Sequence, residues 1–168
     1  MTLRLILMRH AKSSWGDPGL EDHARPLNGR GRRSARAIGE WLAAQDLAPT
    51  TVISSDSQRT RETWSEMAPS LGRPDVQFTP ALYHANPADM LGALQAAHGQ
   101  TVLLLGHNPG CAWFAHQIVS APPDHPRFDD YPTAATLAVA LPIDTWSQLT
   151  WHIGDPISFI VPRDLGIT

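Results

Sequence analysis

Three short segments of this 168-residue chain combine histidine with arginine in a way that suits phosphate chemistry. Arg9-His10 ends an apolar run, Arg59 follows a serine-rich stretch, and His107 stands in the sequence Gly106-His107-Asn108-Pro109. A guanidinium is a planar fork of N–H donors that matches phosphate oxygens, and a neutral imidazole is a competent nucleophile near pH 7. Together these residue types predict attack by a histidine on phosphorus, with arginines stabilising the charge on the oxygens.

The placement of the three segments carries more weight than any one of them, since a lone histidine after a strand is more often packed or exposed than catalytic. Apolar, β-branched runs predict strands at Leu3–Met8, Thr50–Ser54 and Thr101–Leu105. Each run leads directly into one of the three segments. Ligands of open parallel sheets bind beyond the carboxyl ends of the strands. We therefore expect the three segments to meet in one site, where helix N-termini also face the phosphate.

The elements between these strands complete an alternating pattern. Helices are expected after an Asn28 N-cap, over Gln58–Leu71, over Ala88–His98, and from an Asn108 N-cap with Pro109 at N1 through about Val119. Further strands are expected at Val76–Thr79, at Thr136–Leu141 and along an edge through Leu149, Trp151 and Ile153. Alternating strands and helices predict an α/β three-layer sandwich, a mostly parallel central sheet with helices on both faces. No linker or repeat divides the chain, so residues 1–168 are expected to form a single domain.

Composition excludes several other classes of function. The net charge of −3 and the absence of a basic stripe argue against a nucleic-acid partner. No segment approaches the roughly 20 apolar residues of a membrane span, and the N-terminal apolar run is too short for a secretion signal. A single cysteine, Cys111, leaves no intramolecular disulfide and fits a reducing compartment. We expect a cytoplasmic protein.

The motif that begins the chain resembles one that defines a known family. Leu7–Trp15, with the sequence LMRHAKSSW, resembles the RHG motif of the histidine phosphatase superfamily, which includes the phosphoglycerate mutases. Arg25-Pro26-Leu27, the Ser55–Arg59 segment with Thr63, and Gly106–Pro109 follow in the order and approximate spacing of that family. Nearly the whole chain is covered, and the best match is the short branch of phosphohistidine phosphatases of the SixA type. The resemblance implies a phosphoglycerate-mutase-like fold.

The resemblance also implies a role for each matched position. His10 is expected to attack phosphorus and to carry the phosphoryl group during turnover. The positions that surround the phosphate are Arg9, Arg59, His107, Ser13 and, at the rim of the site, Arg25. No metal and no other cofactor is implied. The expected reaction is hydrolysis of phosphate monoesters or phosphoramidates, with a phosphorylated protein or a small phosphorylated molecule as substrate.

One departure from the family pattern bears on the substrate. Larger members place a glutamate acid after the next strand, whereas this chain has no carboxylate there until Asp89. Asp22 is the best substitute because it follows the first motif; His84 and Asp89 are the others. The span between Arg59 and His107 also leaves little chain for a lid. Because the imidazole of phosphohistidine leaves without a dedicated carboxylate, and an open pocket admits a protein side chain, phosphohistidine in proteins is the expected substrate.

Two alternatives remain open from the sequence. A metal-dependent phosphoesterase could use His10, Asp22, Asp56 and His107 as ligands, although the paired arginines would repel a divalent ion. Activity in excess chelator separates that reading from the first. A phosphate-sensing module that has lost turnover is the second alternative. The missing acid favours it, while retention of both histidines and both arginines opposes it.

Overall fold

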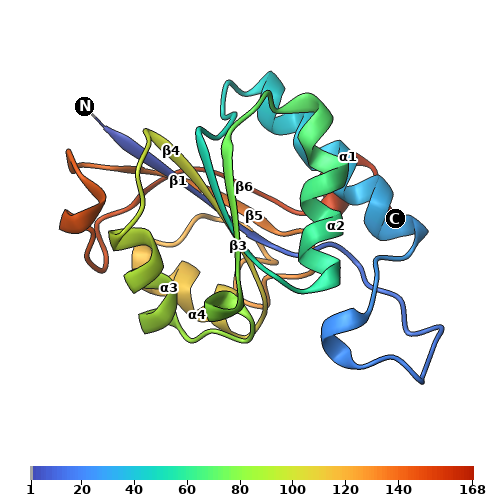
Figure 1. Cartoon of the computed structure of the whole chain (residues 1–168). Coiled ribbons are helices and arrows are strands. Elements are labelled where there is room, and N and C mark those ends of the chain that lie inside the picture. Colours follow the sequence, from blue (N-terminus) through green and yellow to red (C-terminus); the bar gives the residue numbers. More distant parts are fainter. Residues whose placement is uncertain (1) are drawn as a thin grey trace.

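The computed structural model describes residues 2–168 and is built around one six-stranded sheet (Figure 1). The strands lie in the order β3-β2-β4-β1-β5-β6. Their bounds are Leu3–Arg9 (β1), Thr51–Ser55 (β2), Asp75–Thr79 (β3), Thr101–Gly106 (β4), Thr136–Leu141 (β5) and Asp155–Ile160 (β6). Strands β1 to β4 run parallel to one another, and β5 and β6 extend the sheet in antiparallel fashion. The mostly parallel sheet expected from the sequence is confirmed.

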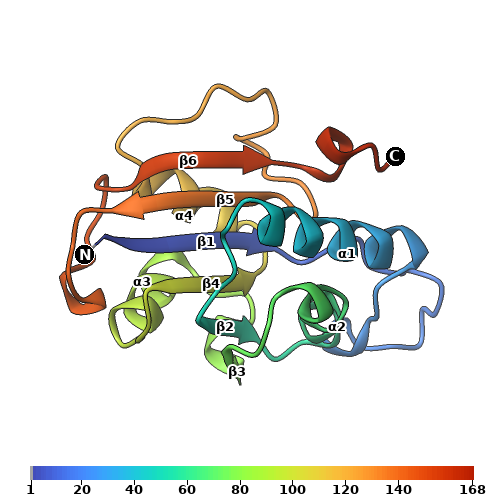
Figure 2. The ribbon, with the colours of Figure 1, turned by 90° about the horizontal axis from the view of Figure 1, so that it is seen from above.

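Helices cover both faces of this sheet. Their bounds are Gly29–Ala44 (α1), Gln58–Met67 (α2), Pro87–Gln95 (α3) and Gly110–Ile118 (α4). Helices α1 and α2 lie together on one face and α3 and α4 on the other, as the two views show (Figures 1 and 2). Strand β1 is buried on both sides: Leu5 and Leu7 belong to the core beneath α3 and α4, while Ile6 and Met8 belong to the core beneath α1 and α2. The three-layer α/β prediction is confirmed.

The register of the strands brings the three motif segments to one edge of the sheet. Arg9, at the end of β1, pairs with Gly106 at the end of β4, and Ser54 of β2 pairs with Leu105. His10, the serine-rich segment before Arg59, and His107 therefore all leave the sheet at the same level. No helix within residues 2–168 is long and apolar enough to cross a membrane.

The predicted edge strand through Leu149, Trp151 and Ile153 is wrong, and the edge is β6 instead. Residues 149–153 form a turn that packs Leu149 into the core and leaves His152 at a φ of 62°. Pro156 obscured the real strand because proline cannot donate to a sheet. It is tolerated here, in an outermost strand opposite Val139 and next to an irregularity in the pairing.

Two helix ends also differ from the sequence-based expectation. Helix α2 ends at Met67 and continues only as a 3-10 turn over Ala68–Ser70, because Pro69 lacks the N–H that a longer α-helix needs. At α4 the cap position is Pro109, which follows a cis peptide bond, so the assignment of Asn108 as N-cap is wrong by one residue. The Asn108 side chain still accepts a hydrogen bond from the Ala112 backbone N–H.

Candidate active site

A pocket of about 240 Å³ opens at the edge of the sheet where β1, β2 and β4 end. The structure brings all the matched positions to this pocket. Its lining residues are Arg9, His10, Lys12, Ser13, Trp15, Asp22, Arg25, Arg59, His84, His107, Asn108 and Thr133. Four of these are lysine or arginine and only Asp22 is acidic, so the pocket is suited to an anion.

The backbone around His10 is held from three sides. The His10 N–H donates to the Gly106 carbonyl at 3.0 Å, and the His10 carbonyl accepts from the Ala134 N–H at 2.9 Å. The next N–H, that of Ala11, donates to the Thr63 hydroxyl, which itself donates to the Arg59 carbonyl of α2. The segment that carries the histidine is thereby tied both to the sheet and to the helix that carries the second arginine.

The His10 ring has a defined tautomer. Its Nδ1 lies 2.7 Å from the Ala11 carbonyl oxygen, which can only accept, so Nδ1 carries the proton and Nε2 has the free lone pair. The side chain is buried, and that burial is the main reason why the pKa of His10 falls to about 3; the charges of Arg9, Arg59 and Arg25 act in the same direction. The ring is therefore neutral, and its Nε2 is available as a nucleophile over the whole physiological range.

Arg9 and Arg59 bring positive charge to the walls of the pocket. Arg59 is only 2% exposed, and it donates to the Asp22 carbonyl at 2.6 Å and to the Asp22 carboxylate at 2.9 Å. Arg9 donates to the Tyr131 carbonyl at 3.3 Å. The buried Nε–H groups of both arginines have no hydrogen-bond partner within residues 2–168. Unsatisfied buried donors of this kind are costly, and an anion in the pocket is one way to satisfy them.

His107 faces His10 across the pocket, with 5.3 Å between the ring centroids. The Arg59 guanidinium lies 3.4 Å from Nδ1 and can only donate, so Nδ1 is the acceptor and Nε2–H donates to the Ser55 hydroxyl at 2.9 Å. Burial, followed by the neighbouring His10 and Arg59, lowers the pKa of His107 to about 2. His107 is thus a neutral, firmly oriented ring in this arrangement.

Ser13 and Arg25 are both buried, although Arg25 was expected at the rim of the site. Arg25 is 7% exposed and not at the rim: its guanidinium donates to the Ser13 hydroxyl at 2.8 Å and to the Ser14 carbonyl at 3.1 Å. Trp15 lies over the guanidinium at 3.6 Å and is itself 72% exposed. Arg25 therefore fixes the path of the loop that follows His10, and Trp15 forms the outer wall of the pocket.

Comparisons with known proteins agree with this arrangement. Residues 5–93 match the model of the histidine phosphatase superfamily, branch 1. The chain belongs to this family. An uncharacterized protein of Mycobacterium tuberculosis is 30% identical over 163 residues, with 93% of this chain and 100% of the other covered. An uncharacterized chloroplastic protein of Arabidopsis thaliana is 34% identical over 119 residues, which are 64% of this chain but only 55% of the plant protein.

Solved structures of the family resemble the whole chain. A candidate phosphohistidine phosphatase SixA of Nakamurella multipartitia is 25% identical in sequence and matches with a TM-score of 0.82. The match covers 96% of this chain and 97% of the other. The protein histidine phosphatase SixA in complex with tungstate has a TM-score of 0.77 at 23% identity, over 97% of this chain and 99% of the other. The phosphoglycerate-mutase-like fold is confirmed, and family and neighbours together indicate a phosphatase that acts through histidine.

Asp22, the first candidate for an acid in this histidine phosphatase, lies among hydrogen-bond donors. Its carboxylate accepts hydrogen bonds from Tyr83, Arg59 and Arg25. Burial alone would raise the pKa of Asp22, but these donors outweigh it and hold the pKa well below the usual range. A carboxylate that stays ionised cannot give a proton to a leaving group. In this arrangement Asp22 balances the charge of two arginines, and its lowered pKa does not favour the role of an acid.

Of the other two candidate acids, one lies in the pocket and one does not. His84 borders the pocket, and its Nε2 lies 3.2 Å from the Asp22 carboxylate, with its ring against Tyr83 and His107. Asp89 lies at the N3 position of α3, where it and Asn86 form a capping box. Asp89 is therefore a helix-capping residue and not part of the site.

The set of metal ligands considered from the sequence is not assembled. Asp56 does not line the pocket, and its carboxylate pairs with His23 at 2.8 Å. In the part of the chain that the structure describes, no group of three His, Cys, Asp or Glu side chains could hold a metal ion.

The sequence analysis did not assign Thr133 or the side chain of Asn108 to the pocket, although both line it. Thr133 comes from the proline-rich loop before β5, which carried no recognisable signal. Asn108 was assigned only as a cap, yet its side-chain amide donates to the Tyr131 carbonyl at 2.9 Å and so ties that loop to the end of β4. The serine-rich segment before Arg59 was the available sign of how His107 is oriented, because the hydroxyls of Ser55 and Ser57 both lie against its Nε2.

Proposed function

We propose that this chain is a phosphohistidine phosphatase that acts on phosphorylated proteins through a phospho-His10 intermediate. The observation that carries the proposal is the state of His10, whose neutral ring has its proton on Nδ1 and its lone pair on Nε2, in a pocket that Arg9 and Arg59 also line. Likeness to phosphohistidine phosphatases of the SixA type supports the substrate class.

In the first step, Nε2 of His10 attacks phosphorus in line, and the bond between phosphorus and the substrate nitrogen breaks. The phosphoryl group is then covalently bound to His10. Arg9 and Arg59 supply donors to its oxygens, and donors that are already oriented stabilise the charge that develops in the transition state. In the second step, water attacks the phosphorus of phospho-His10, inorganic phosphate leaves and the neutral imidazole is restored.

The proton balance favours nitrogen as the leaving atom. An alkoxide is a strong base and departs slowly unless an acid protonates it. Asp22 is held ionised, so it does not fill that role. Phosphohistidine can take up a proton on its second ring nitrogen, from water or from His84, whose ring borders the pocket, and then leaves as neutral imidazole, a weak base. The same argument applies to an aryl phosphate, whose phenolate is stable enough to leave unaided.

The test is a comparison of kcat/KM across substrates in excess chelator. We expect a phosphohistidine protein, free phosphohistidine and an aryl phosphate to be hydrolysed well, and 3-phosphoglycerate and simple sugar phosphates poorly. The chelator should change nothing, because arginines already supply positive charge around the phosphate. A clear preference for one alkyl phosphate metabolite would refute the substrate class. Activity that is lost in chelator and restored by a divalent ion would refute the mechanism.

The cellular setting belongs to the same proposal. The one cysteine, Cys111, is buried and free, which suits a reducing compartment such as the cytoplasm. We place the reaction there, on a phosphoprotein partner and without nucleic acid.

A further inference from the structure

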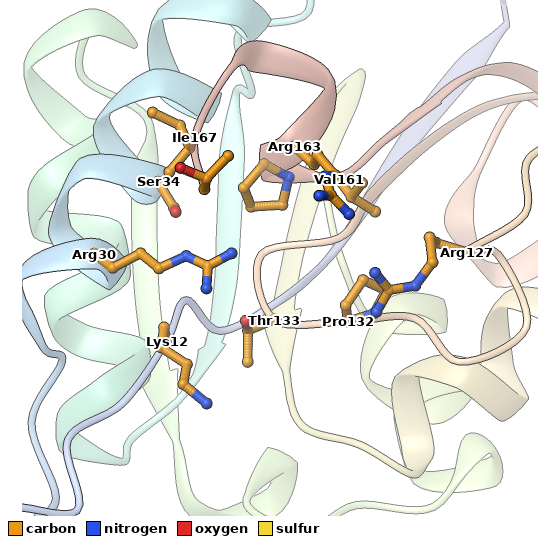
Figure 3. A pocket seen from close by; sticks show the side chains of 11 residues that line it. Lys12, Arg30, Ser34, Arg127, Pro132, Thr133, Val161, Arg163 and Ile167 are labelled. Carbon is orange, nitrogen blue, oxygen red and sulfur yellow. The ribbon is translucent and has the colours of Figure 1, made fainter.

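A second, larger cavity adjoins the catalytic pocket and is lined by cations. It has a volume of about 460 Å³ and shares Lys12 and Thr133 with the catalytic pocket. Arg30 of α1 reaches into it from one side, and Arg127 and Arg163 lie on the other (Figure 3). No aspartate or glutamate side chain lines it. The mechanism proposed above uses none of the four cations Lys12, Arg30, Arg127 and Arg163. We call the cavity that they line the basic cavity.

Three of the four cations have no side-chain partner among residues 2–168. Arg127 forms a salt bridge with Asp130 at 2.9 Å. Lys12, Arg30 and Arg163 make no hydrogen bond or ion pair through their side chains in the described structure. Elsewhere on α1, Arg32 and Arg36 pair with Glu62 and Glu66. The basic cavity therefore holds three cationic side chains that no side chain of the described residues pairs with, and Thr168 at the end of the chain also lines it.

A hydroxyl that lines the same cavity also has no protein partner among the described residues. Ser34 is 2% exposed and makes no hydrogen bond through its side chain within the described residues, and its oxygen points toward the guanidinium of Arg30 (Figure 3). A buried hydroxyl is normally satisfied by a protein group or by water. A hydroxyl that is open to the cavity beside unpaired cations offers an anion a further hydrogen-bond donor.

The fold holds this cavity next to the reaction centre. Gly31 packs so closely on the loop after His10 that a Cβ there would meet the Lys12 carbonyl at 2.1 Å, and Asn28 N–H donates to the same carbonyl at 3.0 Å. The start of α1, and with it Arg30, is thus fixed to the loop that lines both pockets. An elongated ligand whose phosphoryl group lies on His10 can therefore extend over Thr133 into the basic cavity.

We infer that the basic cavity binds carboxylate side chains of an acidic segment that flanks the phosphorylated residue of a protein substrate. The inference rests on the proposed function and specifies its substrate. Guanidinium forks match carboxylates bidentately. The cavity has nearly twice the volume of the catalytic pocket, and its four cationic side chains are exposed to solvent. A polypeptide segment on the surface of a substrate can therefore contact them. The basic cavity thereby favours phosphoproteins with acidic surroundings.

The test compares two phosphohistidine peptides that differ only in having glutamates or glutamines beside the phosphorylated residue. We expect kcat/KM to be about tenfold higher for the glutamate peptide at low salt, as one or two partly exposed ion pairs allow. The preference should shrink as ionic strength rises. The double variant Arg30→Glu/Arg163→Glu should abolish it without changing kcat/KM for an aryl phosphate. Arg33→Glu is the matched control, an exposed arginine of α1 outside both cavities.

A binding measurement without catalysis separates this inference from the proposed function. The glutamate peptide without phosphate should bind the wild type at least severalfold more tightly than the glutamine peptide does, and the double variant should bind both equally. Equal binding of both peptides to the wild type would overturn the assignment of the basic cavity, whatever the activity. Discrimination in binding with no turnover of either phosphopeptide would uphold the cavity and overturn the proposed function.

Discussion

His10 combines burial with a fixed proton position, and both follow from its place at the end of β1. A histidine on the surface would rotate and would be protonated for part of the time at neutral pH. Here the Ala11 carbonyl holds Nδ1–H, and burial keeps the ring neutral. The fold has to compensate for the cost of keeping two neutral, buried rings, since His107 is in the same condition.

That cost predicts a pH dependence of stability. In the unfolded chain both histidines take up a proton below about pH 6.5, whereas in the folded protein the pKa of His10 is about 3 and that of His107 about 2. Between these limits the unfolded state binds more protons, so stability falls as pH falls. At pH 5 each ring should lower the free energy of unfolding by about 2 kcal/mol relative to pH 7.5.

Urea denaturation at pH 7.5 and pH 5 measures the effect. His10→Gln should lose about 2 kcal/mol less between the two pH values than the wild type does. An identical loss in variant and wild type would mean that His10 is not kept neutral by the fold.

Arg59 is expected to contribute mainly to the transition state. Arg59→Ala should lower kcat/KM by two to three powers of ten, because a charge-assisted contact to a developing negative charge is worth about 3–4 kcal/mol. Arg61→Ala is the matched control, since Arg61 lies on the same helix but donates to the Asp56 carbonyl and stacks on Phe78. A larger loss for Arg61→Ala than for Arg59→Ala would contradict the assignment of the second arginine.

Between elements, a glycine sets how closely α4 approaches the segment that carries His84. A Cβ at Gly110 would meet the Ala85 carbonyl oxygen at 2.2 Å. Gly110→Ala should therefore push α4 and the His84 segment apart, lower the free energy of unfolding by about 1–3 kcal/mol and reduce turnover. Gly92→Ala in α3 meets nothing within 4 Å and should leave both unchanged or raise stability by up to about 1 kcal/mol.

Turnover and urea denaturation of the two variants should be compared side by side. Equal behaviour of Gly110→Ala and Gly92→Ala would show that the close contact does not position the site.

Strands and helices could be predicted where the spacing of apolar residues along the sequence distinguishes them. The site could be predicted where its motifs follow the ends of predicted strands. Residues 5–8 and 102–105 are apolar throughout, and at that short length such a run is typical of a strand buried on both faces. The edge was not predictable, because alternation at Leu149–Ile153 comes from a turn packed on the core while Pro156 conceals β6.

Within the site, the residues that close the pocket were harder to foresee than those that react. Thr133 reaches it through the path of a long loop, which the Asn108 side chain fixes. The protonation of Asp22 depends on Tyr83, Arg59 and Arg25 meeting at one carboxylate, and no spacing in the sequence reveals that meeting. The unpaired cations of the basic cavity likewise could not be foreseen, because the sequence does not show which arginines of α1 form ion pairs with Glu62 and Glu66.

At the scale of the molecule, one sheet serves both cores. Leu5 packs on one side of β1 and Ile6 on the other, so neither core is complete without the strand. We propose that the chain folds as one domain and unfolds in one cooperative transition. Urea transitions followed by far-UV circular dichroism and by tryptophan fluorescence should coincide, since Trp64 reports on one core and Trp146 on the other. Two separate transitions would contradict a single domain.

The central claim is that His10 carries the phosphoryl group, and trapping the phosphoenzyme tests it most directly. The protein is mixed with an aryl phosphate, quenched in alkali within one turnover, digested and mapped by mass spectrometry. The account predicts an acid-labile phosphate on His10, at near one equivalent if hydrolysis of the intermediate is slow, and its absence together with loss of activity in His10→Ala. Phosphate on any other residue, or a fully active His10→Ala, would contradict it.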